Sequence, residues 1–320
     1  MKKMRLLFIV ILIYLFSVCA SAAEYLIPGG QVVGLELQDG TVTVAAFHQE
    51  LGENAKKAGL QEGDRILGIG SVQIQNAADV RSALAGTKGK IQLRILRNGK
   101  AKQLTLTPVS TPEGPKLGVY LKYGTTGVGT VTYYHPDSGD FAALGHGVSS
   151  KSGNLLQVFS GSIFDARVRQ IKKGETGHPG QLIGEVTNPD PIGQIRKNTA
   201  QGIFGTLETQ KTASAALPVA DRSEIHTGKA TIRSTLETGV QEYSVEILKI
   251  YPNAPQRTRN MLIKVTDPAL LETTGGIVQG MSGSPIIQDG KLVGAVTHVL
   301  VNDPTTGYGI FIENMLDAAA

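Results

Sequence analysis

The sequence predicts a mainly β protein built from more than one domain. Of its 320 residues, 39 are glycine and none is tryptophan, and aromatic residues make up 5%. This composition favours many tight turns over long helices. Short apolar runs separated by turn residues recur along the chain, which is typical of antiparallel sheets. A chain of this length is also longer than one small domain needs, so we expect a division into separate units.

The N-terminus has the order of residues found in secretory signals. Three basic residues within the first five precede an apolar run at 6–18, and small residues follow. That order predicts export from the cytoplasm. The apolar stretch is also long enough to stay in a membrane, so removal after Ala22 and retention both remain open. Residues 1–23 are therefore expected to be a signal peptide or a membrane anchor.

Cysteine and charge exclude several classes of protein. Cys19 is the only cysteine and lies in the expected targeting segment. The exported part therefore has no disulfide, no Cys-ligated metal and no cysteine nucleophile. The formal net charge is +4, but three of the positive charges belong to the leader. Because no dense stripe of Lys and Arg remains, we expect no nucleic-acid partner, and no cofactor is expected either.

Residues 25–109 have the pattern of a small α+β module. A glycine-bearing loop at 28–30 leads into a strand with alternating apolar residues. A short helix is expected from Asn76, where Asp79 occupies the capping-box position. The dipeptide at 98–99 is Asn-Gly, a strong hairpin signal between two alternating strands.

The segment A-G-L-Q-E-G-D-R-I-L at 58–67 makes this module similar to the PDZ domains attached to bacterial exported peptidases. The resemblance implies that a peptide adds as an extra strand beside the strand after the glycine loop, with its terminal carboxylate held by loop amides. The alternative is that the helix residues of this groove only fill the core of the module. The residues assigned to the groove are Val33, Gly34, Leu35, Val80 and Leu84.

The Pro/Gly-rich stretch 110–115 has the composition of a linker between domains. Residues 116–320 then form a second unit. Many short apolar runs with turns between them predict an antiparallel sandwich or barrel there.

The stretch G-M-S-G-S-P at 280–285 presents a serine between two apolar strands. A nucleophilic serine needs backbone amides aimed at the developing oxyanion, and flanking glycines let the main chain fold tightly around it. The stretch resembles the nucleophile loop of chymotrypsin-like serine peptidases. The resemblance implies Ser282 as nucleophile and the amides of Gly280 and Ser282 as the oxyanion hole. The alternative is a plain turn.

A serine nucleophile needs a base and a group that orients the base. His146, in L-G-H-G at the end of an apolar segment, is the expected base. Asp267, in V-T-D-P, closes an apolar strand and is the best candidate for the third role. Asp137 and Asp140 lie nearer to the histidine in sequence, and Asp267 could also be an ordinary turn residue before a proline.

Taken together, the leader, the PDZ-like module and four motifs resemble the SpoIVB peptidases of endospore-forming bacteria. The motifs are L-G-H-G at 144–147, V-T-D-P at 265–268, G-G-I-V-Q-G-M-S-G-S-P-I-I at 275–287 and G-A-V-T-H-V at 294–299. The resemblance implies a trypsin/chymotrypsin-like antiparallel β-barrel unit. It also implies a catalytic triad of His146, Asp267 and Ser282.

The resemblance to the SpoIVB peptidases also implies a function. Its members are sporulation-signalling endopeptidases that cross or are anchored in the forespore membrane and act in the space between the forespore and mother-cell membranes. They cleave themselves near the N-terminus and also cleave a membrane-embedded regulator. That cleavage releases an intramembrane metallopeptidase, which processes a late mother-cell sigma factor precursor. Expected partners are therefore these protein substrates and a PDZ peptide ligand.

Two rival functions are alternatives to this hypothesis. One is a secreted PDZ scaffold whose second domain is a catalytically inactive peptidase fold. The other is an esterase with the same catalytic groups, although the α/β-hydrolase form lacks its G-x-S-x-G elbow and residue order. Of the other histidines, His298 is expected to be a structural or substrate-cleft residue. The remaining four lack metal-ligand spacing and are expected at the surface: His48, His135, His178 and His226.

Overall fold

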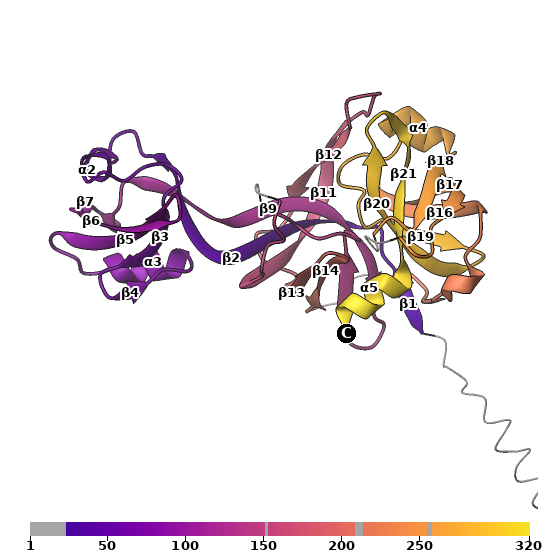
Figure 1. Ribbon diagram of the computed structural model, residues 1–320, viewed down its shortest axis with the longest axis horizontal. Helices are drawn as coiled ribbons and strands as arrows, with labels where there is room; N and C mark the ends of the chain where they lie inside the picture. Colours follow the sequence, from indigo (N-terminus) through magenta and orange to yellow (C-terminus); the bar gives the residue numbers. More distant parts are fainter. Residues whose placement is uncertain (1–23, 151–152, 209–213, 238, 255–257) are drawn as a thin grey trace, which may run out of the picture.

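The computed structural model describes residues 24–320 apart from 151–152, 209–213, 238 and 255–257. It shows a mainly β chain in which a PDZ lobe stands apart from two packed β-barrels (Figure 1). The expected mainly β class is confirmed. Within the described residues, no helix has the length and apolar character needed to span a bilayer. The expected signal or anchor at 1–23 lies outside the described residues.

Two long strands, β2 (Val32–Phe47) and β9 (Val119–Tyr134), connect the PDZ lobe to the barrels (Figure 1). They pair antiparallel from Val32↔Thr130 at the barrels to Phe47↔Val119 in the lobe. The PDZ lobe is thus an insertion between two strands of the peptidase unit. This corrects the expected start of the PDZ domain at 25, because residues 25–37 belong to the first barrel, and its expected end at 109, because residues 119–123 pair with β2 and pack on the lobe core. The stretch expected as a linker forms the β7–β8 hairpin (Val109–Thr111 and Gly114–Lys116).

The PDZ lobe packs helix α3 against a small sheet and has its own apolar core. The expected capping box is present: the Asn76 side chain accepts from the Asp79 amide, and the Asp79 carboxylate accepts from the Asn76 amide. The expected hairpin turn is also present, with positive φ at Asn98 and Gly99. The further elements of this lobe are α2 (Glu53–Lys57), β3 (Arg65–Ile69), β4 (Val72–Gln73), α3 (Ala77–Leu84), β5 (Ile91–Arg97) and β6 (Lys100–Leu106).

The first barrel is a ring of strands closed by the pairing of β2 with β9. Among the described residues, the pairings run β9–β10–β14–β13–β11–β2 and back to β9. Gly129 on β9 is required by close packing, because a Cβ there would lie 2.1 Å from Cδ2 of Leu144. The elements of this part are β1 (Tyr25–Pro28), β10 (Asp140–Ala143), β11 (Ser160–Lys172), β12 (Gln181–Val186), β13 (Gly193–Thr199), β14 (Gly202–Leu207) and β15 (Leu217–Pro218).

The second barrel is closed in the order β16–β17–β18–β21–β20–β19. This confirms the barrel among the two expected architectures. Its largest apolar cluster fills the interior and extends to the nucleophile loop. The elements are η1 (Arg222–Glu224), β16 (Gly228–Thr235), β17 (Val240–Ile250), β18 (Met261–Val265), α4 (Pro268–Thr274), β19 (Pro285–Gln288), β20 (Lys291–Leu300), β21 (Asp303–Phe311) and α5 (Ile312–Ala319).

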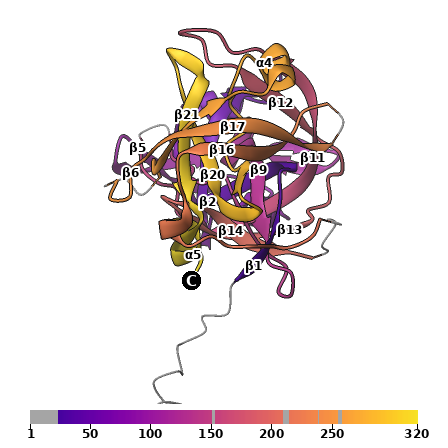
Figure 2. The ribbon, with the colours of Figure 1, turned by 90° about the vertical axis from the view of Figure 1, so that its right-hand side faces the viewer.

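The two barrels share a buried interface. An apolar cluster joins β1, β9 and β10 of the first barrel with β20 and β21 of the second. Helix α5 adds Ile312 and Met315 to this cluster, and both are fully buried. Figure 2 views the barrels from the end opposite the PDZ lobe, with α5 beside the strands of both. Loops from both barrels can therefore meet in one fixed geometry.

Candidate active site

The nucleophile loop lies between α4 and β19 and is held against β9 of the first barrel. Gly283 has φ +97°, and a Cβ there would lie 2.0 Å from the carbonyl oxygen of Thr130. Gly280 has φ +100°. Residues with a side chain rarely adopt these backbone φ values, so glycine is required on both sides of Ser282. The sequence pattern thus reflects a real constraint of the backbone.

The orientation of the peptide planes in the loop leaves two backbone amides available to bind an oxyanion. The Gln279 carbonyl accepts from the Leu182 amide, and the Met281 carbonyl accepts from the Ser284 amide. In a trans peptide the N–H points opposite to the carbonyl. The amides of Gly280 and Ser282 therefore point away from these anchors, and both residues line the same pocket as His146. This arrangement supports the predicted oxyanion hole.

Thr130 on β9 anchors the loop twice. Its hydroxyl donates to the Gly280 carbonyl at 2.7 Å, and its amide donates to the Ser282 carbonyl at 3.1 Å. Thr130 is fully buried and Gly280 is half-buried, and loss of the Thr130 hydroxyl would leave the Gly280 carbonyl without this donor. The position of the oxyanion amides therefore depends on a residue of the other barrel.

Thr130→Val should lower kcat/KM by about tenfold. This factor corresponds to about 1.4 kcal/mol for loss of the hydrogen bond to the Gly280 carbonyl. Steady-state kinetics on a peptide substrate would measure this. The matched control is Thr132→Val, two residues along the same strand. Thr132 is also fully buried, but its hydroxyl has no partner among the described residues. Equal losses in the two variants would contradict an anchoring role for Thr130.

His146 follows β10 after a strained turn. Leu144 has φ +70°, an uncommon value for a bulky side chain, and Gly145 has φ +67°. Nδ1 of His146 lies 3.0 Å from the carbonyl oxygen of Gly147. Because a carbonyl only accepts, Nδ1 carries the proton in the neutral ring and Nε2 is left as the acceptor. That is the tautomer which a general base needs.

Ser282 is in a resting orientation. Its hydroxyl donates to the carbonyl oxygen of Thr297 on β20 at 2.9 Å. The single hydroxyl proton is therefore not donated to His146. Ser282 and His146 line one pocket, and catalytic hydrogen bonds commonly tighten only when substrate is bound. The buried hydroxyl of the neighbouring Ser284 has no partner among the described residues.

His298 lies beside the base. The ring centroids of His146 and His298 are 5.4 Å apart. Nδ1 of His298 is buried without a partner among the described residues. Burial, followed by the charges of His146 and Arg259, lowers the pKa of His298 to about 4. His298 thus remains neutral beside His146 at neutral pH, and whether its role is structural or in substrate binding stays open.

Burial lowers the pKa of His146 below its usual 6.5, and the Gly147 carbonyl partly opposes this effect. The base must be neutral to accept the proton of Ser282. A lowered pKa keeps it neutral to lower pH, so activity should persist below pH 6.5 and fall as pH passes through the lowered pKa. A pH profile of kcat/KM would test this. An acid limb at or above pH 6.5 would contradict it.

The hydrogen bonds of Asp267 are those of a helix cap, and its expected catalytic role stays a prediction. Asp267 is the N-cap of α4: its carboxylate accepts from the Leu270 amide at 3.1 Å and from the Ser244 amide at 3.3 Å. His298 pairs with Tyr308, which pairs with Leu262 on β18. Asp267 lies five residues beyond Leu262, or about 16 Å along an extended chain. The structure therefore assigns capping to the residue expected in the third catalytic role.

The structure also shows the positions of Asp140, another of the acidic candidates, and of Asn198, which supports the loop after His146. Asp140 begins β10, at the end of that strand opposite His146, and accepts from Ser138 and Thr206. Asn198, at the end of β13, binds the loop after His146: its side chain accepts from the Val148 amide and donates to two carbonyls. Sequence analysis missed Asn198, because nothing local relates it to residues about 50 positions earlier.

Asp267→Asn separates the two roles. Asparagine is also a good N-cap, so loss of the charge should cost about 1 kcal/mol or less in the free energy of unfolding and leave kcat near the parent value. If Asp267 orients the base, the same change should lower kcat about 10⁴-fold. Steady-state kinetics with parallel thermal melts would decide between these roles.

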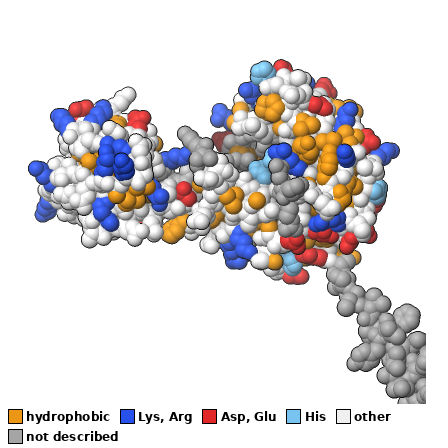
Figure 3. Space-filling model, viewed as in Figure 1, with side chains coloured by type: hydrophobic (Ala, Val, Ile, Leu, Met, Phe, Trp, Pro, Cys, Tyr) orange, Lys and Arg blue, Asp and Glu red, His pale blue; other side chains and the backbone are white. Residues whose placement is uncertain are grey.

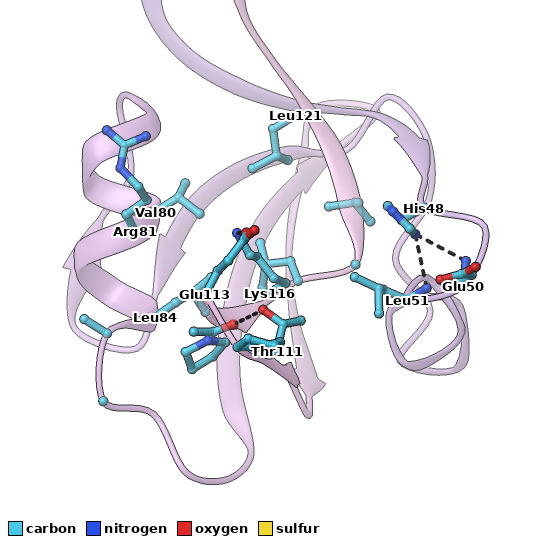
Figure 4. Close-up of a pocket in the computed structure, with 18 residues that line it drawn as sticks. His48, Glu50, Leu51, Val80, Arg81, Leu84, Thr111, Glu113, Lys116 and Leu121 are labelled. Atoms are coloured by element: carbon cyan, nitrogen blue, oxygen red, sulfur yellow. Dashed lines mark hydrogen bonds and ion pairs between the residues drawn. The ribbon is translucent and has the colours of Figure 1, made fainter.

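The PDZ groove lies between α3 and the start of β9. It has a volume of about 840 Å³, and the helix contributes Val80, Leu84 and Arg81 (Figure 4). Val80 and Leu84 also belong to the core of the lobe, so both expected roles apply to them. The facing strand contributes Val119 and Leu121, and His48 lies at the groove, stacked on Tyr120 at 5.6 Å.

The strand assignment for this groove is corrected. Val33, Gly34 and Leu35 pair with β11 on one side and β9 on the other. Both edges of β2 are therefore occupied there, and no peptide strand can be added. The error arose because the chain enters the first barrel before it enters the PDZ lobe, so the strand that faces α3 comes after the lobe. That strand begins at Val119, directly after Gly118.

A serine peptidase site needs a serine beside available backbone amides and a neutral imidazole. Ser282, Gly280 and His146 line one pocket between the barrels. The protein is a serine peptidase. The model of the family described as SpoIVB peptidase S55 matches residues 113–316, about two thirds of the chain, and the chain belongs to that family. A PDZ-domain model matches residues 52–97. Membership favours a peptidase over the rival hypothesis of an inactive scaffold.

Other similarities are partial. The chain is 38% identical over 80 residues to a protein of Staphylococcus aureus (strain N315) named as a zinc metalloprotease, and 39% identical over 59 residues to one of Helicobacter pylori. These matches cover 25% and 18% of this chain, which spans only 19% and 17% of those relatives.

Among solved structures, the active form of the Rv3671c protease from M. tuberculosis aligns with 12% identity and a TM-score of 0.38. That alignment covers 60% of this chain and 72% of the other. The inactive form aligns with 12% identity and a TM-score of 0.35, over 59% and 81%.

Proposed function

We propose that this serine peptidase is an exported endopeptidase of sporulation signalling. It cleaves itself near the N-terminus and cleaves a membrane-embedded regulator. Loss of the regulator activates an intramembrane metallopeptidase, which processes a late mother-cell sigma factor precursor. The observation that carries this proposal is the joining of Ser282 and His146 at one pocket in a chain that belongs to the SpoIVB peptidase family.

The proposed place of action is the space between the forespore and mother-cell membranes. The signal-like order of residues 1–23 supports export across the forespore membrane or anchoring in it. The exported chain has no cysteine, so its fold does not depend on the redox state of that space.

The PDZ lobe is proposed to bind a peptide as an added strand between α3 and the start of β9. Lys and Arg side chains are spread over the visible face of this lobe (Figure 3). Residues 41–123 contain twelve Lys and Arg against six Asp and Glu. This charge favours a partner that presents a free carboxylate or acidic residues.

Expression of the full chain and of its Ser282→Ala variant in an endospore-forming host that lacks its own copy tests the proposal. Intact mass should show N-terminal trimming of the parent only, and immunoblots should show processing of the sigma factor precursor only with the parent. Equal trimming in both strains would contradict self-cleavage. Trimming without precursor processing would contradict the signalling role.

A further inference from the structure

Apolar atoms make up most of the surface of the pocket shared by Ser282 and His146. Its volume is about 280 Å³. That is slightly below the usual size of small-molecule sites, so it fits one or two side chains rather than a whole ligand. Its lining comprises Leu35, Leu37, Thr125, Thr126, Gly127, Val128, Leu144, His146, Val148, Gln279, Gly280 and Ser282.

The pocket is on the side of Ser282 from which a leaving group departs. The serine hydroxyl touches β20 through the Thr297 carbonyl, but no residue of β20 lines this pocket. Leu144 and Val148, on either side of the base in sequence, do line it. The leaving amine takes its proton from the base, so the residue after the cleaved bond is released next to this lining.

The chemistry of the lining selects an apolar side chain. Leu35 and Leu37 project from the same face of β2, and both are almost fully buried. Leu144 is also buried, and Val128 is half-buried. The polar members Thr126 and Gln279 are exposed, which places them at the rim. A polar side chain in such a site would lose its hydration without a matching partner, whereas an aliphatic one gains by burial.

We propose that this pocket selects substrates with an aliphatic or aromatic side chain immediately after the cleaved bond. The selection rests on the peptidase activity described above and adds the class of peptide that it takes. The strands that carry the PDZ lobe, β2 and β9, form one wall of the pocket. The stretch around Leu35, expected from the sequence to bind a PDZ ligand, therefore serves the peptidase site instead.

Gly127 allows a sharp test. It pairs with Leu35 across the two strands, so a side chain there points to the same face. A Cβ at Gly127 meets nothing within 4 Å, and its φ is not in the left-handed region. Gly127→Val can therefore narrow the pocket without a clash. Lys122→Val, on an exposed position of the same strand outside both pockets, is the matched control.

The full chain, Gly127→Val, Lys122→Val and Ser282→Ala are each incubated with a peptide library, and cleavage sites are mapped by mass spectrometry. Parent and Lys122→Val should enrich Leu, Ile, Val, Met or Phe just after the cleaved bond. Gly127→Val should lower kcat/KM for these peptides about tenfold relative to peptides with Ala or Gly there.

Three results would overturn the assignment. Cleavage that depends on Ser282 but shows no preference for the residue after the cleaved bond would contradict the proposed role of the pocket. An equal loss for all peptides in Gly127→Val would contradict it too, and neither result would affect the catalytic assignment. Parent cleavage that Ser282→Ala retains would contradict the catalytic assignment and the pocket with it.

Discussion

Ser282→Ala should abolish peptide cleavage, with a fall in kcat on the order of 10⁶-fold, as for nucleophiles that act as a unit with their base. The reason is geometric. Ser282 lines the same pocket as His146, between two glycines with positive φ. Loss of the hydroxyl leaves the oxyanion amides in place but removes the atom that forms the acyl-enzyme. Kinetics on a fluorogenic peptide would measure the change.

Ser284→Ala is the matched control for that variant. Ser284 lies two residues further along, is fully buried, and its hydroxyl has no partner among the described residues. Removal of this hydroxyl should leave kcat near the parent value and should not lower the melting temperature. A comparable loss of activity in Ser284→Ala would show that the wrong serine has been assigned.

His146→Gln should lower kcat by a similar amount, because a serine without its base is a weak nucleophile. The Ser282→Ala/His146→Gln double variant should be no worse than either single variant, since the two groups act in one step. The comparison is kcat for the two single variants and the double variant on one substrate. Multiplying losses in the double variant would contradict a shared step.

His298→Gln is the control for this prediction because its ring lies 5.4 Å from that of His146. It should lower kcat far less, since the structure already provides the Gly147 carbonyl to fix the tautomer of the base. If His298→Gln abolished activity while His146→Gln kept it, the assignment of the base would be reversed.

Local signals predicted much of this molecule. The cap at Asn76, the Asn98–Gly99 hairpin and the turn glycines around Ser282 depend on residues close in sequence, and each is present. The spacing of small residues around the serine reports a backbone constraint that the structure confirms. Short-range chemistry of this kind can be inferred from sequence because its cause lies within a few residues.

Long-range relations could not be inferred in the same way. Nothing local shows that the strand containing Leu35 belongs to the peptidase barrel, because its partner on β9 follows an inserted lobe about 90 residues later. Thr130 contacts the Gly280 carbonyl across 150 positions. The family resemblance implies Asp267 as the triad acid, but the same residue type before Pro268 also suits a helix cap, and the structure shows it as the N-cap of α4.

The most direct test of the central claim is labelling of the full chain with a serine-directed fluorophosphonate, followed by mass mapping of the modified peptide. The structure predicts one adduct, on Ser282, which is absent in Ser282→Ala and strongly reduced in His146→Gln. An adduct on another serine, or equal labelling of folded parent and Ser282→Ala, would contradict the assignment of Ser282 as the nucleophile.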